Sequence, residues 1–288
     1  MLAAVVAVLA LGGLAFTLLG SSTTKITDPV AEAATISSDA GGYRIHMAIS
    51  VSSPSTGTSF TAVGDGTVNT RDHAARVTLA MNLGENPQVT QALGASTLRI
   101  TELVDGTSVY MKLPTAVVGA LGSLGKPWLK LDVAKALHMP GLASMESNPA
   151  MGAPSQMLQY LRAVSASVIA EGHQRVGGFE TTRYHADLSL DRVVSALPPA
   201  EQGAAQHSIA ALEQATLIHT VPVDVWIDRH HLVRRMQMSF TGAVSGGQAT
   251  SLGLRVDYSD YGPQSRPTLP PPDQVQDVGA PVAGLSGH

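Results

Sequence analysis

One stretch near the carboxyl end of the chain alternates strictly between two kinds of residue, and this pattern limits the possible folds most. Between Val221 and Asp228, every second residue is valine or isoleucine, and the intervening residues are proline, aspartate and tryptophan. Successive side chains of a β-strand point to opposite faces, so the stretch predicts a strand with one apolar face. Similar stretches recur from Tyr43 to Tyr258 and predict about ten or eleven strands, mostly joined by hairpin turns.

The expected strands fall into two groups, and glycines mark several of the turns. Asp105-Gly106 and Gly177-Gly178 are typical of hairpin turns. Gly64-Asp65-Gly66 predicts a bulge or kink inside the second strand. The expected strands are residues 43–51, 60–68, 75–81, 98–104, 108–112, 128–132, 168–176, 179–190, 221–228, 235–240 and 252–258.

Two segments between the strands have helical periodicity. Residues 154–164 place Leu158 and Leu161 on one apolar stripe, and residues 204–216 form a second candidate. The pattern as a whole predicts the α+β class, with a single strongly curved antiparallel β-sheet, a half-barrel, wrapped over a few helices. An antiparallel sheet of this many strands tends to curl, and its concave side would leave room for a cavity.

The chain ends differ from the middle. Residues 1–20 are apolar except for Thr17 and carry no charge, and as a helix they would span ~30 Å, about one bilayer core. This segment predicts an export signal or a membrane anchor, and the sequence leaves open whether it is cleaved. Both outcomes predict an extracytoplasmic protein of the cell envelope, anchored or secreted. We expect residues 21–36 to be a flexible tether, 37–262 one folded domain and 263–288 a disordered Pro- and Gly-rich tail.

Composition excludes several classes of function. Charged residues make up 14% of the chain, against ~25% in typical soluble proteins. The net charge is −4, and no run of Lys or Arg is present, which argues against nucleic-acid binding. Cysteine is absent, which excludes thiol catalysis, disulfides and Cys-based zinc sites. Hydrophobic residues reach 44% although aromatic residues reach only 4%, so the apolar content is mainly aliphatic.

No catalytic, metal or cofactor site is expected. The motifs G-x-S-x-G and H-E-x-x-H are absent, and Ser22-x-x-Lys25 and Ser123-x-x-Lys126 match a catalytic pattern only by letter. His230-His231 is expected in a solvated turn. We expect four charged residues to lie on strand surfaces or at a rim rather than to form an acid–base pair: Glu180, Arg183, Asp224 and Asp228.

A series of short phrases resembles the LppX/LprA/LprF/LprG group of mycobacterial lipoproteins and their actinobacterial relatives. The similarity covers roughly residues 36–278 in the same order, although Ser21 stands where the lipid-bearing Cys of the group is found. The phrases are Asp105 to Lys112, Gly125 to Lys130, Gly178 to Tyr184, Val221 to Asp228, Leu232 to Met236 and Asp257 to Gly262. The resemblance implies a LolA/LolB-like half-barrel with a hydrophobic cavity, and non-enzymatic transport or presentation of acylated lipids in the envelope.

The cavity predicted in this way would be lined by the apolar stripes. As partners we expect the acyl chains of a lipid or lipoglycan, the membrane through the N-terminal segment, and an envelope transporter as a further candidate. The alternative is an envelope scaffold or sensor module whose core is filled by its own side chains. The candidate cavity residues are Met47, Ile49, Val77, Leu79, Met111, Leu129, Leu158, Leu161, Met236 and Met238.

Overall fold

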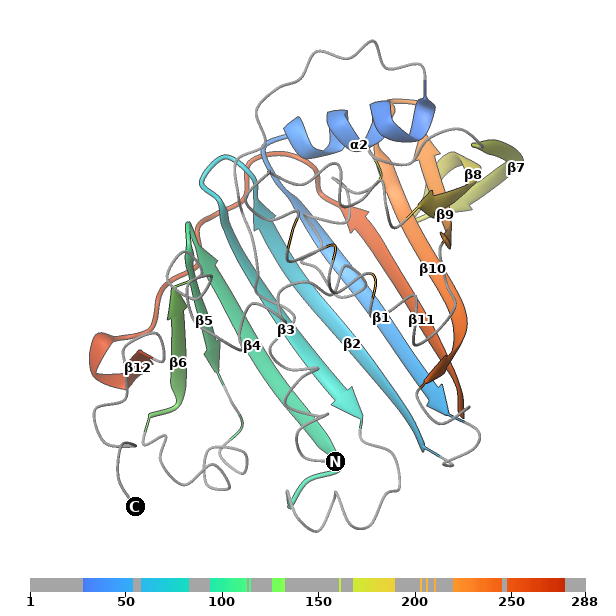
Figure 1. Cartoon of the computed structure of the whole chain (residues 1–288). Coiled ribbons are helices and arrows are strands. Elements are labelled where there is room, and N and C mark those ends of the chain that lie inside the picture. Colours follow the sequence, from blue (N-terminus) through green and yellow to red (C-terminus); the bar gives the residue numbers. More distant parts are fainter. Residues whose placement is uncertain are drawn as a thin grey trace.

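The described part of the chain is mostly β-structure, arranged as one sheet of twelve strands with one short α-helix beside it (Figure 1). The structure is a computed structural model, and it describes residues 28–53, 58–82, 94–112, 114, 126–132, 161, 168–189, 203, 206, 210, 220–244 and 248–277. The strands are β1 (Tyr43–Ser53), β2 (Thr58–Asn69), β3 (Ala74–Asn82), β4 (Thr97–Asp105), β5 (Ser108–Lys112), β6 (Trp128–Asp132), β7 (Ile169–Val176), β8 (Phe179–Ser189), β9 (Thr220–Asp228), β10 (Val233–Val244), β11 (Gln248–Ser259) and β12 (Val275–Asp277).

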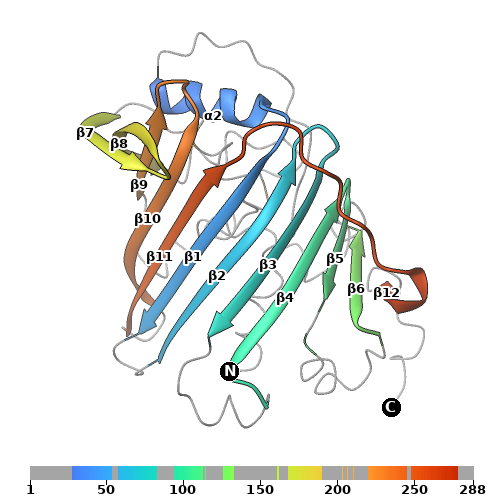
Figure 2. The ribbon, with the colours of Figure 1, turned by 180° about the vertical axis from the view of Figure 1, so that it is seen from behind.

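The sheet consists of two runs of sequential neighbours that meet in its middle. Its order is β12-β6-β5-β4-β3-β2-β1-β11-β10-β9-β8-β7. Strands β1 to β6 pair each with the next, as do β7 to β11, and the two runs join where β1 pairs with β11. Figure 2 shows this junction from behind, with β1 and β11 side by side. The prediction of a single sheet in mainly hairpin-linked order is therefore confirmed.

Eleven of the strands lie where the alternation predicts them, and the glycine turns behave as expected. Gly177 and Gly178 have φ values of 56° and 87°, and Gly106 has 60°. Gly177 and Gly178 thus have the positive φ that a type I′ turn needs at both central residues, and Gly106 has it at the first central residue, as in a type II′ turn. Glycine adopts positive φ without strain. The bulge predicted at Gly64-Asp65-Gly66 is wrong, because β2 keeps an unbroken register with both β1 and β3 there.

The twelfth strand lies inside the predicted disordered tail. After β11 the chain crosses the upper ends of β1 to β5 and reaches the far edge of the sheet (Figure 2). There the 3-10 helix η2 (Pro272–Gln274) leads into β12, which pairs with β6 in parallel orientation. The sheet is therefore mixed rather than purely antiparallel. Three contacts hold this segment: Asn69 Nδ2 donates to the Gln264 carbonyl, Arg266 pairs with Asp105, and Lys126 Nζ donates to the Val275 carbonyl.

Helix α2 (Pro29–Asp39) begins inside the segment predicted as a flexible tether. Asp28 caps it, because its Oδ1 accepts a hydrogen bond from the Val30 N–H at 2.8 Å, and Pro29 supplies a suitable first-turn residue. Val30, Ala33 and Ala34 are fully buried against the sheet. The capping signal and the small apolar residues explain why part of this Ser/Thr/Ala-rich segment is helical and packed.

The core lies between α2 and the face of the sheet that it covers, which we call the inner face. Val30 and Ala34 of α2 belong to one cluster with Tyr43, Ile45 and Met47 of β1. The opposite side of the sheet is called the outer face. The predicted N-terminal segment 1–20 and most of the predicted helices 154–164 and 204–216 lie outside the described residues. Within the residues described, no helix is long and apolar enough to cross a bilayer.

Candidate functional site: the apolar inner face

Cross-strand rows of apolar side chains run over most of the inner face. In a sheet, residues paired in register share a face and contact their neighbours, so each row follows from the pairing alone. The central row has a residue from each of eight strands and contains no charged side chain. Its members, from β4 to β8, are Ile100, Leu79, Gly64, Met47, Val256, Met236, Val225 and Tyr184.

A second row lies beside the first, nearer to α2, and it differs at one position. It contains Leu129, Met111, Glu102, Val77, Gly66, Ile45 and Tyr258. A carboxyl group thus interrupts a row that is otherwise apolar or aromatic.

Nine of the ten predicted cavity residues are described, and Leu158 lies outside the described residues. The register places eight of them on the inner face, and Leu161 packs into the same cluster. They differ in burial: Met47, Leu161 and Met236 are buried, whereas the rest are half-buried. The half-buried residues are Ile49, Val77, Leu79, Met111, Leu129 and Met238.

Four of the six half-buried positions lie on strands inside the sheet, on β1, β3 and β10, and the other two, Met111 and Leu129, lie nearer the β12 edge. Val77 and Leu79 are successive inner-face residues of the central strand β3, and Ile49 and Met238 lie on the row next to Leu79 and Met47. All four pack against the core cluster on one side. Aliphatic side chains at the centre of a sheet are normally buried on their core face. Here the inner face therefore keeps apolar surface that the protein covers only in part.

Strand β2 contributes only glycines, Gly64 and Gly66, to the two rows described above. A Cβ atom at Gly64 would lie 2.8 Å from Met47 Cγ and 3.1 Å from Leu79 Cδ1. A Cβ atom at Gly66 would lie 2.7 Å from the backbone oxygen of Arg76. The side chains of β1 and β3 thus meet over β2, which explains why these glycines are found in a regular strand.

Glu102 is the functional candidate that sequence reasoning missed. Only 7% of its surface is exposed, and its Oε1 has no hydrogen-bond partner. Burial raises the pKa of this carboxyl from 4.5 to about 8. The alternation did contain the signal, because Glu102 lies two residues from Ile100 and two from Val104, on the apolar side of the strand.

The outer face carries charged networks instead. Arg183 Nη2 and His185 Nδ1 each lie 2.8 Å from a different oxygen of Asp224. The guanidinium of Arg183 stacks 5.3 Å from the ring centre of Trp226. Trp226 is buried and donates its indole N–H to Gln174 Oε1 at 2.8 Å. Asp224 thus links Arg183 and His185 in one polar network on the outer face.

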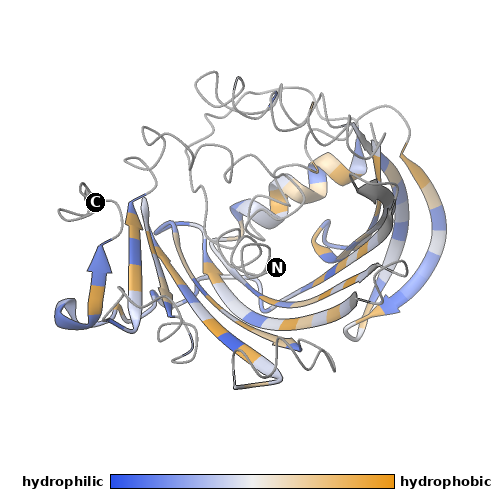
Figure 3. Cartoon of the chain, turned by 60° about the horizontal axis from the view of Figure 1, so that its bottom comes forward, coloured by the Kyte–Doolittle hydropathy of each residue, from blue (hydrophilic) through white to orange (hydrophobic). Residues whose placement is uncertain are grey.

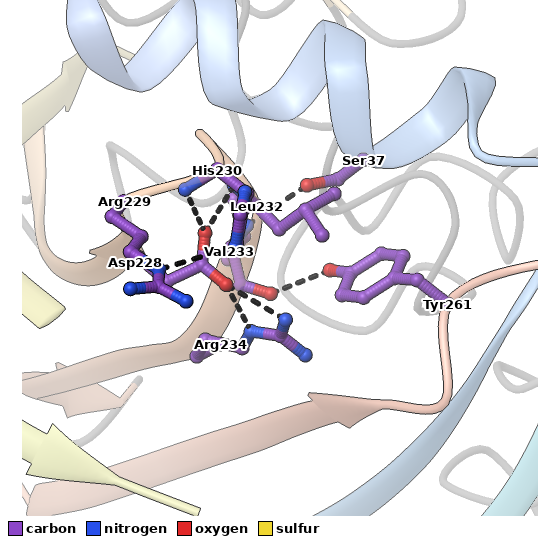
Figure 4. Close-up of polar contacts among 8 residues, drawn as sticks. All are labelled: Ser37, Asp228, Arg229, His230, Leu232, Val233, Arg234 and Tyr261. Atoms are coloured by element: carbon purple, nitrogen blue, oxygen red, sulfur yellow. Dashed lines mark hydrogen bonds and ion pairs between the residues drawn. The ribbon is translucent and has the colours of Figure 1, made fainter. Parts of the chain in front are cut away.

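A separate buried ion pair fastens the β9–β10 turn (Figure 4). Oδ1 of Asp228 accepts the N–H groups of His230 and Leu232 at 2.8 and 3.0 Å, and Oδ2 lies 2.7 Å from Arg234 Nη2. Burial acts to raise the pKa of Asp228, but these hydrogen bonds and the charge of Arg234 lower it overall. The prediction that Asp228 lies on the surface is wrong, because only 6% of it is exposed.

The same turn connects to α2 and to the segment after β11. The Val233 N–H donates to Ser37 Oγ at 2.9 Å, and the Tyr261 hydroxyl donates to the Val233 carbonyl. His230 and His231 are exposed, as the sequence predicts. Among the residues that the structure describes, no group of His, Asp or Glu is arranged to hold a metal ion.

Comparisons with known proteins find similar structures but no similar sequences. No family model and no curated protein matches the chain. LprF from Mycobacterium bovis is 12% identical with a TM-score of 0.43, and the match covers 83% of this chain and 94% of LprF. LppX from Mycobacterium tuberculosis is 16% identical with a TM-score of 0.42, covering 83% of this chain and 99% of LppX. A LolA superfamily protein from Nitrosomonas europaea is 8% identical with a TM-score of 0.32, covering 83% and 93%.

LprF and LppX both belong to the group that the sequence motifs resemble.

Proposed function

We propose that this protein binds an apolar, lipid-like molecule on the inner face of its sheet and carries or presents it in the cell envelope without catalysing a reaction. The observation that supports this most is the group of half-buried aliphatic residues at the sheet centre, among them Val77, Leu79 and Met238. Covering apolar surface stabilises a complex by about 25 cal/mol per Å². An acyl chain laid along these rows would therefore bind without needing specific polar contacts.

The proposed binding mode uses a strongly curved sheet, a half-barrel, with the ligand on its concave side. In the view of Figure 3, the strands at both ends of the sheet rise toward the side on which α2 lies, which supports this shape. The small inner-face residues of β2 support it further, because Gly64 and Gly66 let the side chains of β1 and β3 approach each other.

An envelope location is part of the same proposal. It is supported by the apolar, uncharged residues 1–20 and by the resemblance of the motifs to envelope lipoproteins. In this setting the predicted partners are a lipid or lipoglycan, the membrane through the N-terminal segment, and an envelope transporter that supplies or receives the lipid.

A direct test is to purify the full chain from an actinobacterial host and to examine it by native mass spectrometry and lipid extraction. We expect a mass above that of the polypeptide and an extractable lipid that denaturation releases. Several preparations that show the polypeptide mass alone, and no saturable binding of the apolar dye Nile red, would contradict the proposal.

Two valines on opposite faces of the sheet provide a matched comparison. Val77 is half-buried on the inner face, whereas Val63 is 50% exposed on the outer face. Replacing each by the nearly isosteric threonine places a hydroxyl on either side of the sheet. We expect Val77→Thr to weaken Nile red binding about threefold to tenfold and Val63→Thr to leave it unchanged, because only the first adds a polar group to the binding surface. Equal effects of the two substitutions would argue against the inner face.

The alternative function is a scaffold or sensor domain with a filled core. One observation favours it: beneath α2 the packing is complete, with Val30, Ala33 and Tyr43 fully buried. Under this alternative, the half-buried residues bind no ligand, and Val77→Thr changes only the free energy of unfolding. The binding measurements above separate the two functions.

A further inference from the structure

Among the described residues, the inner face holds one acidic side chain with a buried oxygen that lacks a hydrogen-bond partner. Glu102 lies on β4 with Val77 opposite it on β3 and Met111 opposite it on β5. Its neighbours along the same face of β4 are Ile100 and Val104, which are buried apolar residues. Only 7% of the surface of Glu102 is exposed, and its Oε1 has no hydrogen-bond partner.

No described charge on the packed elements faces this carboxyl. The strands that contact β4 are β3 and β5, and β6 follows beyond β5. By register, the inner-face residues of these three strands are Ala75, Val77, Leu79, Met81, Val109, Met111, Leu129 and Leu131. Lys112 and Lys130 occupy the alternate, outer-face positions.

A buried carboxyl without a cation is held in its neutral form, because an isolated charge in an apolar setting is very costly. Burial raises the pKa of Glu102 to about 8, which agrees with this. A neutral carboxylic acid has one O–H donor and still accepts hydrogen bonds. Buried donors and acceptors without hydrogen bonds destabilise the folded protein. A polar group of a bound molecule would supply the missing hydrogen bond to the Glu102 carboxyl.

We infer that Glu102 is the polar contact of the ligand site and forms a hydrogen bond with a neutral hydroxyl group of an otherwise apolar molecule. This inference rests on the proposed lipid binding and adds the chemistry of the ligand. A hydroxyl matches a neutral acid because it both donates and accepts. An ammonium group fits less well, because it would have to lose its hydration and ionise the carboxyl in the same step.

Tyr43 carries the other unpartnered polar atom that the structure shows on this face, and it makes a weaker candidate. Its hydroxyl is buried without a hydrogen bond, but its ring packs 5.5 Å from Tyr258 and 5.7 Å from Tyr261, centre to centre. It therefore lies within the packed region below α2. Glu102 instead lies beside the half-buried Val77 and Met111.

The test compares two probes of equal length, decan-1-ol and 1-chlorodecane, as competitors of Nile red on the full chain. The wild type is expected to prefer decan-1-ol. Glu102→Met removes the polar group while keeping an apolar side chain of similar length, and we expect the preference to fall about threefold to tenfold, the effect of one hydrogen bond. Glu102→Gln keeps a donor and an acceptor, so it should retain the preference.

Controls separate the possible outcomes. Arg99→Met makes a similar change on the exposed, outer side of the same strand and should leave the preference unchanged. Comparing decan-1-ol with decan-5-ol shows whether the hydroxyl belongs at the head of the molecule or along its chain. If the wild type binds no apolar probe, the proposed function fails. If it binds them and Glu102→Met keeps the same preference in a folded protein, only the assignment of Glu102 is overturned.

Discussion

The surroundings of two buried carboxyl groups shift their pKa values in opposite directions. Asp228 is surrounded by donors, with two backbone N–H groups on one oxygen and the Arg234 guanidinium on the other, so its pKa is lowered. Glu102 has apolar neighbours, and burial raises its pKa to about 8. Asp228 is therefore a structural anion, and Glu102 is a neutral acid at the pH of most cells.

The pH dependence of stability should reveal Glu102. In the unfolded chain this carboxyl has its ordinary pKa of 4.5, and in the folded protein about 8. Between these values the unfolded chain releases a proton that the folded protein keeps, so rising pH favours unfolding. The contribution of neutral Glu102 to the free energy of unfolding is fully present below pH 4.5, and it is lost as pH rises through 8. Urea unfolding should show a loss on the order of a few kcal/mol over this range that Glu102→Gln lacks. Parallel pH profiles of the two proteins would contradict the neutral state.

Removing the Asp228 carboxylate should be costly. Asp228→Ala leaves Arg234 buried without its partner and two turn N–H groups without an acceptor. We expect the free energy of unfolding to fall by about 3–5 kcal/mol, measured by urea denaturation at pH 7. Asp65→Ala is the control, because Asp65 pairs with His46 on the exposed outer face, where such pairs contribute about 0–1 kcal/mol. Similar losses in both variants would show that Asp228 and Arg234 have no special role.

At the scale of elements, the sequence predicted what depends on local pattern. Alternation located the strands from Tyr43 to Ser259, and glycine located the tight turns. Helix α2 was missed because its single capping residue, Asp28, lies in a stretch rich in Ser, Thr and Ala. Glycines 64 and 66 were misread as a bulge, since a pattern in one strand does not show that neighbouring side chains need the space.

The two glycines of β2 should respond differently to alanine. At Gly66 a new Cβ meets the backbone oxygen of Arg76 at 2.7 Å, so the paired strands must shift. At Gly64 the nearest atom, at 2.8 Å, belongs to the flexible side chain of Met47. We expect Gly66→Ala to destabilise by about 1–3 kcal/mol and Gly64→Ala by less than about 1 kcal/mol. Thermal unfolding of the pair tests this, and the reverse order would mean that backbone contact does not limit β2.

At the scale of the whole molecule, the sequence predicted one sheet in hairpin order but not how the sheet ends. Strand β12 lies in a Pro- and Gly-rich stretch without useful alternation, and it forms because the chain after β11 is held by contacts with Asn69 and Asp105. Such distant contacts leave no local signal. Glu102 also depends on distant contacts. Alternation predicts the face of the strand on which it lies, but its lack of a hydrogen-bond partner is a property of the assembled face.

The junction of β1 with β11 has a consequence for the order of folding. Every other antiparallel contact in the sheet joins successive strands of the chain, whereas this one joins Arg44 to Ser259. Closing so long a loop is slow, because its entropy is lost before the contacts form. Within each half, the strands can therefore pair outward from their hairpin turns, and β1 pairs with β11 last. Pulsed hydrogen exchange during refolding should protect amides shared by β2 and β3 before those shared by β1 and β11. Until then each half exposes an unpaired strand edge that can pair with another chain. Slow closure should therefore make this protein prone to aggregate before it has folded completely.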